Sequence, residues 1–207
     1  LTVVELFQSQ GCSSCPPAND NVILLADDSD KLMLTYEVTY WDYIGWPDTF
    51  GKKEWDVRQR DYSYALKNRN VYTPQVIVNG LANGVGSRKG ELSSLLADGA
   101  SSPYASTVTI TASAAQITIS GPASTRGIVQ LVFYDPTTYD VYVQRGENRG
   151  RTLPHRNIVR ELLVLGWWEG GELSLPLPDL PGGTEGLRKA VLVQRGRGGP
   201  ILGAAKI

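Results

Sequence analysis

Two cysteines, Cys12 and Cys15, are the residues whose type and spacing point most directly to chemistry. They form a C-x-x-C motif that follows the apolar run 2–7 and precedes Pro16 and Pro17, which suit the first turn of a helix. Free backbone N–H groups at the start of a helix favour the thiolate form of a nearby cysteine. Cys12 is therefore the expected nucleophile and Cys15 the residue that resolves the mixed disulfide.

Other uses of the same pair stay open. A short C-x-x-C pair also occurs as a structural disulfide, as two free thiols or as a metal-binding pair. Thiolates suit Cu(I), but no methionine lies near the pair in sequence to support such a site, and Met33 is the only methionine of the chain. Two cysteines and one histidine do not supply the common tetrahedral zinc sets. We therefore expect no metal site and no other cofactor.

A group of aromatic residues fills the segment 40–47, in which Trp41, Tyr43 and Trp46 are candidate substrate-binding residues. The segment follows the second expected strand, so it belongs at the sheet edge where the cysteine loop emerges. Tryptophan and tyrosine are favoured at interfaces, which makes a peptide-binding platform one interpretation. Packing against the second half of the chain is an equally good one.

Two titratable residues are further candidates. Glu5 lies in the strand before the cysteines, where a buried carboxylate could accept the proton of Cys15. Charged strand residues are more often solvated, so the alternative is a surface position. His155 could act in acid–base chemistry, but a lone histidine in an arginine-rich turn is more often a surface residue.

The elements that must position these residues follow from hydrophobic periodicity and turn signals. The first half is expected to run in the order β-α-β-α-β-β-α. Its strands are expected at 2–7, 32–40, 75–79 and 81–84, and its helices from Pro16 onward, at 54–70 and at 89–98. Thr73-Pro74 directly precedes the third strand, where a proline costs no ladder hydrogen bond and is by default trans.

The second half alternates short β-rich runs with turn residues, which predicts an all-β antiparallel sandwich. The turn-prone, non-periodic stretch 98–106 is the expected linker, dividing the chain into an α/β domain at 1–102 and a sandwich domain at 103–207. The predicted strands are 106–111, 116–120, 127–134, 140–144, 157–165, 172–177, 189–194 and 201–205. No catalytic signature occurs in this half. Its arginines Arg145, Arg149, Arg151, Arg156 and Arg160 are expected on a solvated face, with an anion-binding patch as the alternative.

Composition excludes several classes of protein. The chain has 207 residues, is 42% hydrophobic and contains ten tyrosines and five tryptophans, which is enough to bury a core. A net charge of −1 gives no basic surface for nucleic acid, so no nucleic-acid partner is expected. No apolar run reaches the length of a membrane span, and no signal peptide is visible.

The stretch VVELF followed by GCSSC, together with YTPQVIVNG, resembles the thioredoxin and glutaredoxin superfamily. More narrowly, ELFQSQGCSSCPPA with YWDYIGW and VYTPQ is similar to a bacterial secreted family of unknown function with a thioredoxin-like domain. The resemblance implies a thioredoxin-like fold for residues 1–102, a cis peptide bond at Pro74 beside the cysteines, and a Thr73 backbone that pairs with substrate. It also implies a periplasmic or secreted protein. Ser87, Arg88 and Lys89 depart from the acidic residues with which glutaredoxins hold glutathione.

Two functional hypotheses follow. In the first, the chain is an extracytoplasmic thiol–disulfide oxidoreductase whose partner is a protein dithiol or disulfide, or a small thiol. In the second, it is a non-enzymatic binding module and the disulfide is a relic or a structural staple. Copper binding is a third, weaker alternative.

Overall fold

The computed structural model describes residues 1–101, 103–104, 107–180 and 183–207. In the first half the predicted order of strands and α-helices is confirmed, with two 3-10 helices added. The elements are β1 (Thr2–Gln8), α1 (Pro16–Val22), η1 (Ile23–Asp27), β2 (Lys31–Glu37), η2 (Asp42–Ile44), α2 (Lys53–Ala65), β3 (Gln75–Val78), β4 (Ala82–Gly84) and α3 (Lys89–Ala100).

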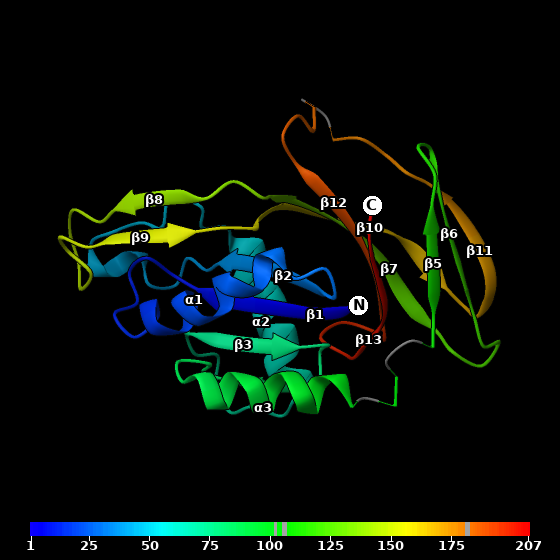
Figure 1. Cartoon of the computed structure of the whole chain (residues 1–207), viewed down its shortest axis with the longest axis horizontal. Coiled ribbons are helices and arrows are strands. Elements are labelled where there is room, and N and C mark those ends of the chain that lie inside the picture. The colour runs from blue at the N-terminus through cyan, green and yellow to red at the C-terminus, as the bar shows by residue number, and fades with distance from the viewer. Residues whose placement is uncertain (102, 105–106, 181–182) are drawn as a thin grey trace.

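Helices cover both faces of the sheet in this half. Strand β1 pairs in parallel with β2 and antiparallel with β3. Its residues Val4 and Leu6 pack with α1 and α3, whereas Val3 and Phe7 pack toward α2. Because both faces are buried, β1 is a near-continuous apolar run and not an alternating one. The first half is therefore a three-layer α/β arrangement (Figure 1).

The second half is made of strands. They are β5 (Thr109–Ala112), β6 (Gln116–Gly121), β7 (Gly127–Asp135), β8 (Tyr139–Tyr142), β9 (Thr152–His155), β10 (Ile158–Trp168), β11 (Gly171–Pro176), β12 (Arg188–Gln194) and β13 (Ile201–Lys206). All eight predicted segments contain a strand, although Ser106, where the first was expected to begin, lies outside the described residues. Strand β9 was missed, because Pro154 and the arginines around it read as a turn.

Strands from both halves form one eight-stranded sheet, in the order β13-β12-β7-β10-β2-β1-β3-β4. The junction between β10 and β2 is short, with Ile158 opposite Thr35. It is reinforced by the Thr35 N–H, which donates to the Asn157 carbonyl at 2.9 Å, and by the Asn157 side chain, which donates to the Met33 carbonyl at 2.8 Å. The sheet thus crosses the predicted boundary. The division into domains 1–102 and 103–207 stays a prediction, and residue 102 lies outside the described residues.

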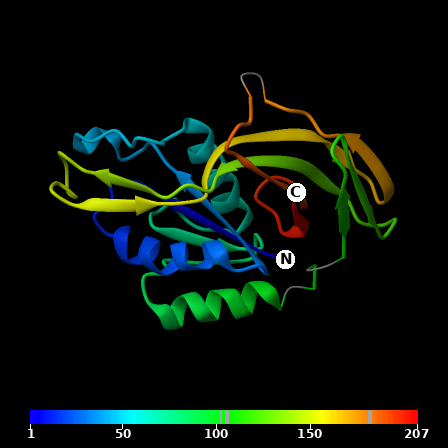
Figure 2. The ribbon, with the colours of Figure 1, turned by 45° about the horizontal axis from the view of Figure 1, so that its top comes forward.

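A smaller three-stranded sheet, β11-β6-β5, packs on the part of the large sheet built by the second half (Figures 1 and 2). The core between them contains Ile117, Ile119, Leu131, Phe133 and Trp168, all at most 1% exposed. The two layers bury the alternate apolar residues of β6 and β7. This packing lies at the end of the molecule away from α1.

Strands β8 and β9 form a separate antiparallel hairpin between β7 and β10. The hairpin lies at the end of the molecule opposite the small sheet, over the loops that follow β1 and β2 (Figures 1 and 2). Strand β9 contacts α1, and the Asn19 side chain donates to the Pro154 carbonyl at 2.7 Å. The second half therefore reaches the cysteine loop through this hairpin. Among the described residues, no helix is long and apolar enough to span a membrane.

Candidate disulfide site

Cys12 and Cys15 form a disulfide in the loop between β1 and α1, with their Cα atoms 5.5 Å apart. The loop is a tight turn, because the Cys12 N–H donates to the Ser9 carbonyl and the Cys15 N–H to the Cys12 carbonyl. Cys15 is the N-cap of α1, and the predicted prolines occupy the first helical turn. Both cysteines are buried, at 3% and 2% exposure, whereas Ser13 and Ser14 between them are exposed. The disulfide thus lies just beneath the surface of the loop.

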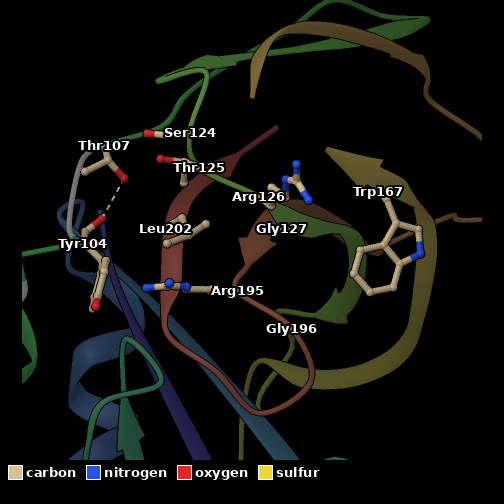
Figure 3. A pocket seen from close by; sticks show the side chains of 10 residues that line it. All are labelled: Tyr104, Thr107, Ser124, Thr125, Arg126, Gly127, Trp167, Arg195, Gly196 and Leu202. Atoms are coloured by element: carbon tan, nitrogen blue, oxygen red, sulfur yellow. Dashed lines mark hydrogen bonds between the residues drawn. The ribbon is translucent and has the colours of Figure 1, made fainter. Parts of the chain in front are cut away.

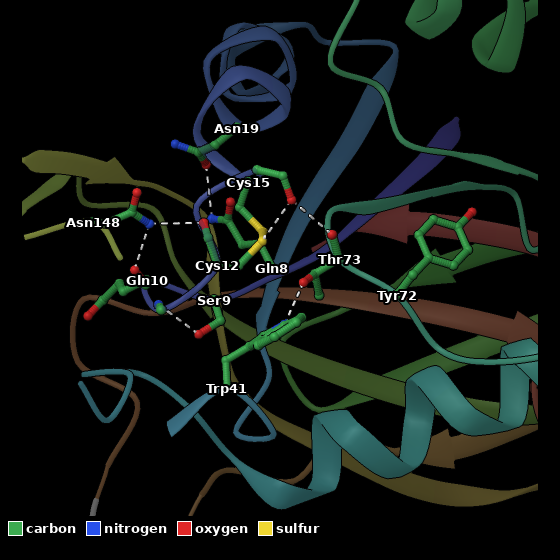
Figure 4. Close-up of a disulfide and its surroundings, with 12 residues drawn as sticks. Gln8, Ser9, Gln10, Cys12, Cys15, Asn19, Trp41, Tyr72, Thr73 and Asn148 are labelled. Carbon is green, nitrogen blue, oxygen red and sulfur yellow. Dashed lines mark hydrogen bonds between the residues drawn. A yellow bond between two sulfur atoms is a disulfide. The ribbon is translucent and has the colours of Figure 1, made fainter. Parts of the chain in front are cut away.

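On one side the loop meets the segment before β3 (Figure 4). The Thr73-Pro74 peptide bond is cis, as the resemblance implied. The Ser14 hydroxyl lies 3.4 Å from the Cys12 sulfur and donates to the Thr73 carbonyl at 3.3 Å. The Thr73 hydroxyl in turn accepts a hydrogen bond from the Trp41 indole at 2.6 Å. These contacts bring the cysteine loop, Thr73 and Trp41 together.

On the opposite side the loop is held by Asn148, from the turn of the β8–β9 hairpin (Figure 4). The Asn148 side-chain amide donates to the Gln10 and Cys12 carbonyls, both at 2.9 Å. Its carbonyl oxygen accepts from Arg151 at 3.0 Å. Asn148 is fully buried, and its bonds to the Gln10 and Cys12 carbonyls are shielded from water. A residue 136 positions further along the chain therefore fixes the backbone of Cys12.

The aromatic residues divide into two roles. Trp41 and Trp46 contact the site, because the Trp46 indole donates to the Gln10 side chain at 2.9 Å and Trp41 bonds to Thr73. Tyr43 is 80% exposed and stacks on Trp41 with 6.3 Å between ring centroids. Tyr43 is therefore the residue of the three that presents a free aromatic surface beside the loop.

Glu5 lies in a different environment. It is fully buried on the α2 side of β1, where its carboxylate accepts from the Arg58 side chain at 2.7–2.8 Å and from the Tyr62 hydroxyl. Arg58 also reaches the Gln130 and Gln194 side chains. Burial lowers and the charge of Glu5 raises the pKa of Arg58, and the net shift is upward. The structure thus places Glu5 with a guanidinium partner, not in contact with the cysteine loop.

His155 is 2% exposed, so the expected surface position is wrong. It lies at the end of β9, packs edge-on against Phe50, and shares a 2.8 Å hydrogen bond between its Nδ1 and the Glu37 carboxylate. Glu37 also accepts from the Gln8 side chain at 3.0 Å. Pairing of β9 with β8 turns the histidine inward, which a single-residue motif does not reveal.

Asp48 completes this buried polar group behind the cysteine loop. Its carboxylate accepts from the backbone N–H groups of Gln10 and Phe50 at 2.7 and 2.9 Å. Burial raises the pKa of Asp48 well above its ordinary value, the negative charge of Glu37 adds to the increase, and the two backbone bonds oppose it. Sequence reasoning missed Asp48, Glu37 and Asn148, because each acquires its role from a partner distant in the chain.

No cluster of three or more histidine, cysteine or acidic side chains within the described ranges has the geometry of a metal site. A recess of about 510 Å³ opens elsewhere, at the turns of the second half (Figure 3). It is lined by Tyr104, Thr107, Ser124, Thr125, Arg126, Gly127, Trp167, Arg195, Gly196 and Leu202. None of the residues around the disulfide contributes to it.

The fold and the site define an α/β protein in which a Cys-x-x-C disulfide lies beside a cis prolyl segment. A family model described as a protein of unknown function (DUF1223) matches residues 3–194, and the chain belongs to that family. The chain is also similar to a protein from Agrobacterium tumefaciens whose crystal structure was solved by a structural genomics consortium. The two share 30% identity with a TM-score of 0.83, over 100% of this chain and 93% of that one. A search of curated proteins gives no match.

Proposed function

We propose that the chain is a thiol–disulfide oxidoreductase that uses the Cys12–Cys15 pair on protein or small-thiol partners. The observation that carries the proposal is the contact of the cysteine loop with Thr73, through the Ser14 hydroxyl. It supports a site in which a partner strand replaces Ser14 on the Thr73 carbonyl and brings its sulfur to Cys12. The order of elements and the cis bond at Pro74 also support the thioredoxin-like relationship that the sequence resemblance implies.

A partner with two thiols can reduce the Cys12–Cys15 disulfide in two exchange steps. A partner thiolate attacks the Cys12 sulfur, the Cys12–Cys15 bond breaks, and Cys15 leaves as a thiolate that takes up a proton. The second partner thiolate then attacks the partner sulfur of the mixed disulfide and releases Cys12. The partner loses two electrons to the cysteine pair. With a reduced pair and a partner disulfide the same steps run in reverse, with Cys12 attacking and Cys15 resolving.

Disulfide exchange in both directions tests this proposal. We expect the oxidised protein to oxidise dithiol peptides and the reduced protein to accelerate the reduction of insulin. Cys12→Ser should abolish both activities, and Cys15→Ser should accumulate a mixed disulfide through Cys12. Ser93→Ala, an exposed position of α3 that contacts neither cysteine, is the control and should retain activity. Wild-type protein inactive in both directions would rule the proposal out.

A second candidate function is a non-enzymatic binding module with a structural disulfide, and the burial of both sulfur-bearing residues favours it. In that case partners bind at the exposed surface of Tyr43 and the hairpin without exchange. The Cys12→Ser, Cys15→Ser double variant would then retain partner binding in full. A copper role would require stoichiometric Cu(I) binding by the reduced pair, which a titration measures directly.

The proposed function suits an oxidising compartment, because disulfides persist outside the cytosol. We therefore propose a periplasmic or secreted location. Detection of the Cys12–Cys15 disulfide after rapid alkylation of intact cells, confined to the extracytoplasmic fraction, would support this assignment.

A further inference from the structure

The β8–β9 hairpin brings exposed arginines to the rim of the disulfide site. Of the five arginines in residues 145–160, two are ion-paired at the base of the hairpin. Arg156 bonds to Asp27 at 2.5 Å, and Arg160 bonds to Asp135 at 2.9 Å. The Arg156 pair fixes the hairpin to η1 of the first half, and the Arg160 pair joins β10 to β7. Neither guanidinium group is available to a partner.

The other three arginines lie in the hairpin tip, defined here as residues 143–151. Arg145, Arg149 and Arg151 are exposed, and none of them forms an ion pair with a carboxylate that the structure describes. Glu147 is the acidic residue of the tip. Three guanidinium groups against one carboxylate make the tip locally basic in a chain whose net charge is −1.

Short contacts hold this basic tip against the cysteine loop. Asn148, between Glu147 and Arg149, donates to the Cys12 carbonyl, and Arg151 donates to Asn148. Gly146 lies against Trp46 and Ile44 on the neighbouring loop. Arg149 therefore directly follows Asn148, whose side-chain amide contacts the backbone of Cys12. A partner that approaches the disulfide meets the hairpin tip on one side.

We propose that the hairpin tip selects partners whose reactive cysteines are flanked by acidic residues. The inference rests on the proposed exchange function and names its substrate class. Guanidinium groups pair with carboxylates through two parallel hydrogen bonds, and an unpaired basic cluster accelerates encounter with an acidic partner. Ser13 and Ser14, the exposed residues of the cysteine loop, carry no charge that would oppose this selection.

The test measures second-order rates at which the oxidised protein oxidises dithiol peptides of one core sequence, flanked by aspartates, by serines or by lysines. We expect the aspartate peptide to react about tenfold faster than the lysine peptide at low salt, and the difference to shrink as salt is added. The Arg145→Glu, Arg149→Glu variant should reverse this order. It leaves Asn148 and Arg151 in place.

The matched control is Arg126→Glu, Arg197→Glu, which alters two exposed arginines away from the hairpin and changes net charge equally. It should keep the wild-type order of peptides. If all three peptides react at equal rates, or if the control acts like the hairpin variant, the proposal that the hairpin tip selects partners is wrong. The proposed disulfide-exchange function is not contradicted by either result. If no peptide reacts although dithiothreitol reduces the disulfide of the folded protein, the selection fails, and the proposed function fails with it if the reduced protein also does not accelerate the reduction of insulin.

Discussion

At the scale of single residues, the site depends on side chains that hold the cysteine loop and not only on the cysteines. Ser14 links the Cys12 sulfur to Thr73, and Asn148 holds the Cys12 carbonyl from the other side. Thr73 and Asn148 both belong to segments far from the motif in sequence. The environment of the disulfide is therefore set by tertiary structure, and changes at Asn148 should affect it without touching a sulfur.

Replacing Asn148 by alanine tests this dependence. The substitution leaves the buried Gln10 carbonyl without its donor, at a cost of about 1–3 kcal/mol, and leaves the Cys12 carbonyl with only the Cys15 N–H as donor. We expect lower stability in urea unfolding and faster reduction of the disulfide by dithiothreitol. The exposed neighbour Gln144→Ala is the control and should change neither quantity. Unchanged reduction kinetics in a destabilised Asn148→Ala protein would show that this residue does not hold the loop.

Glu5 permits a test of structural against chemical roles. Its carboxylate is the buried counter-charge of Arg58, so Glu5→Gln leaves an uncompensated cation and should destabilise the fold by about 3–5 kcal/mol. Exposed Glu54→Gln on α2 should be neutral. The proton-transfer hypothesis predicts instead that Glu5→Gln is stable and that its disulfide-exchange rate has an altered pH profile. Urea unfolding and exchange kinetics, measured on the same variant, therefore distinguish the structural role from the chemical one.

At the scale of elements, the order of strands and α-helices in the first half follows from the sequence because each of these elements carries its own signal. The apolar run of β1, the prolines of α1 and the turn at Asn79-Gly80 are local features. The cysteine pair and Thr73-Pro74 are recognisable for the same reason. Asn148 and His155 are not, because their partners Cys12 and Glu37 lie more than 100 positions away in the chain. Asp48 is not, because its backbone donor Gln10 lies 38 positions away.

The contact between the β3–β4 turn and the β12–β13 turn gives a prediction at this scale. Gly80 has a φ of +68°, and a Cβ there would lie 2.4 Å from the Gly199 carbonyl oxygen. Gly80→Ala should therefore destabilise the protein by about 2 kcal/mol or more in urea unfolding. Gly90 in α3 has open space around it, and Gly90→Ala should stabilise by about 0.5–1 kcal/mol. Equal effects at the two sites would contradict the packing described for the turns.

At the scale of the whole molecule, the two halves share a sheet, a hairpin that crosses between them and a buried polar group. The polar group joins Asp48 and Glu37 from the first half to His155 from the second. Sequence patterns predict most strands of each half but not that the two sets join in one sheet. The β10–β2 pairing that joins them is only one residue pair long and leaves no periodic signal.

The raised pKa of Asp48 predicts how stability depends on pH. The Asp48 carboxyl group stays protonated in the folded protein at pH values where it is ionised in the unfolded chain. Its contribution to the stability of the fold is therefore fully present below its ordinary pKa of 3.8. It is lost as pH rises from there through the raised pKa. Urea unfolding across this range should show a fall in stability with pH in the wild type, and a smaller fall in Asp48→Asn. If the stability of the two proteins changes equally with pH, titratable groups other than Asp48 cause the fall.

The central claim is that the buried Cys12–Cys15 disulfide exchanges electrons in the folded protein. The most direct measurement equilibrates native protein with dithiothreitol buffers of graded ratio, traps free thiols by alkylation, and follows folding by circular dichroism. The account predicts a reversible two-electron transition of both cysteines with the fold retained. A disulfide that resists excess dithiothreitol until urea unfolds the chain would contradict it and identify the bond as structural.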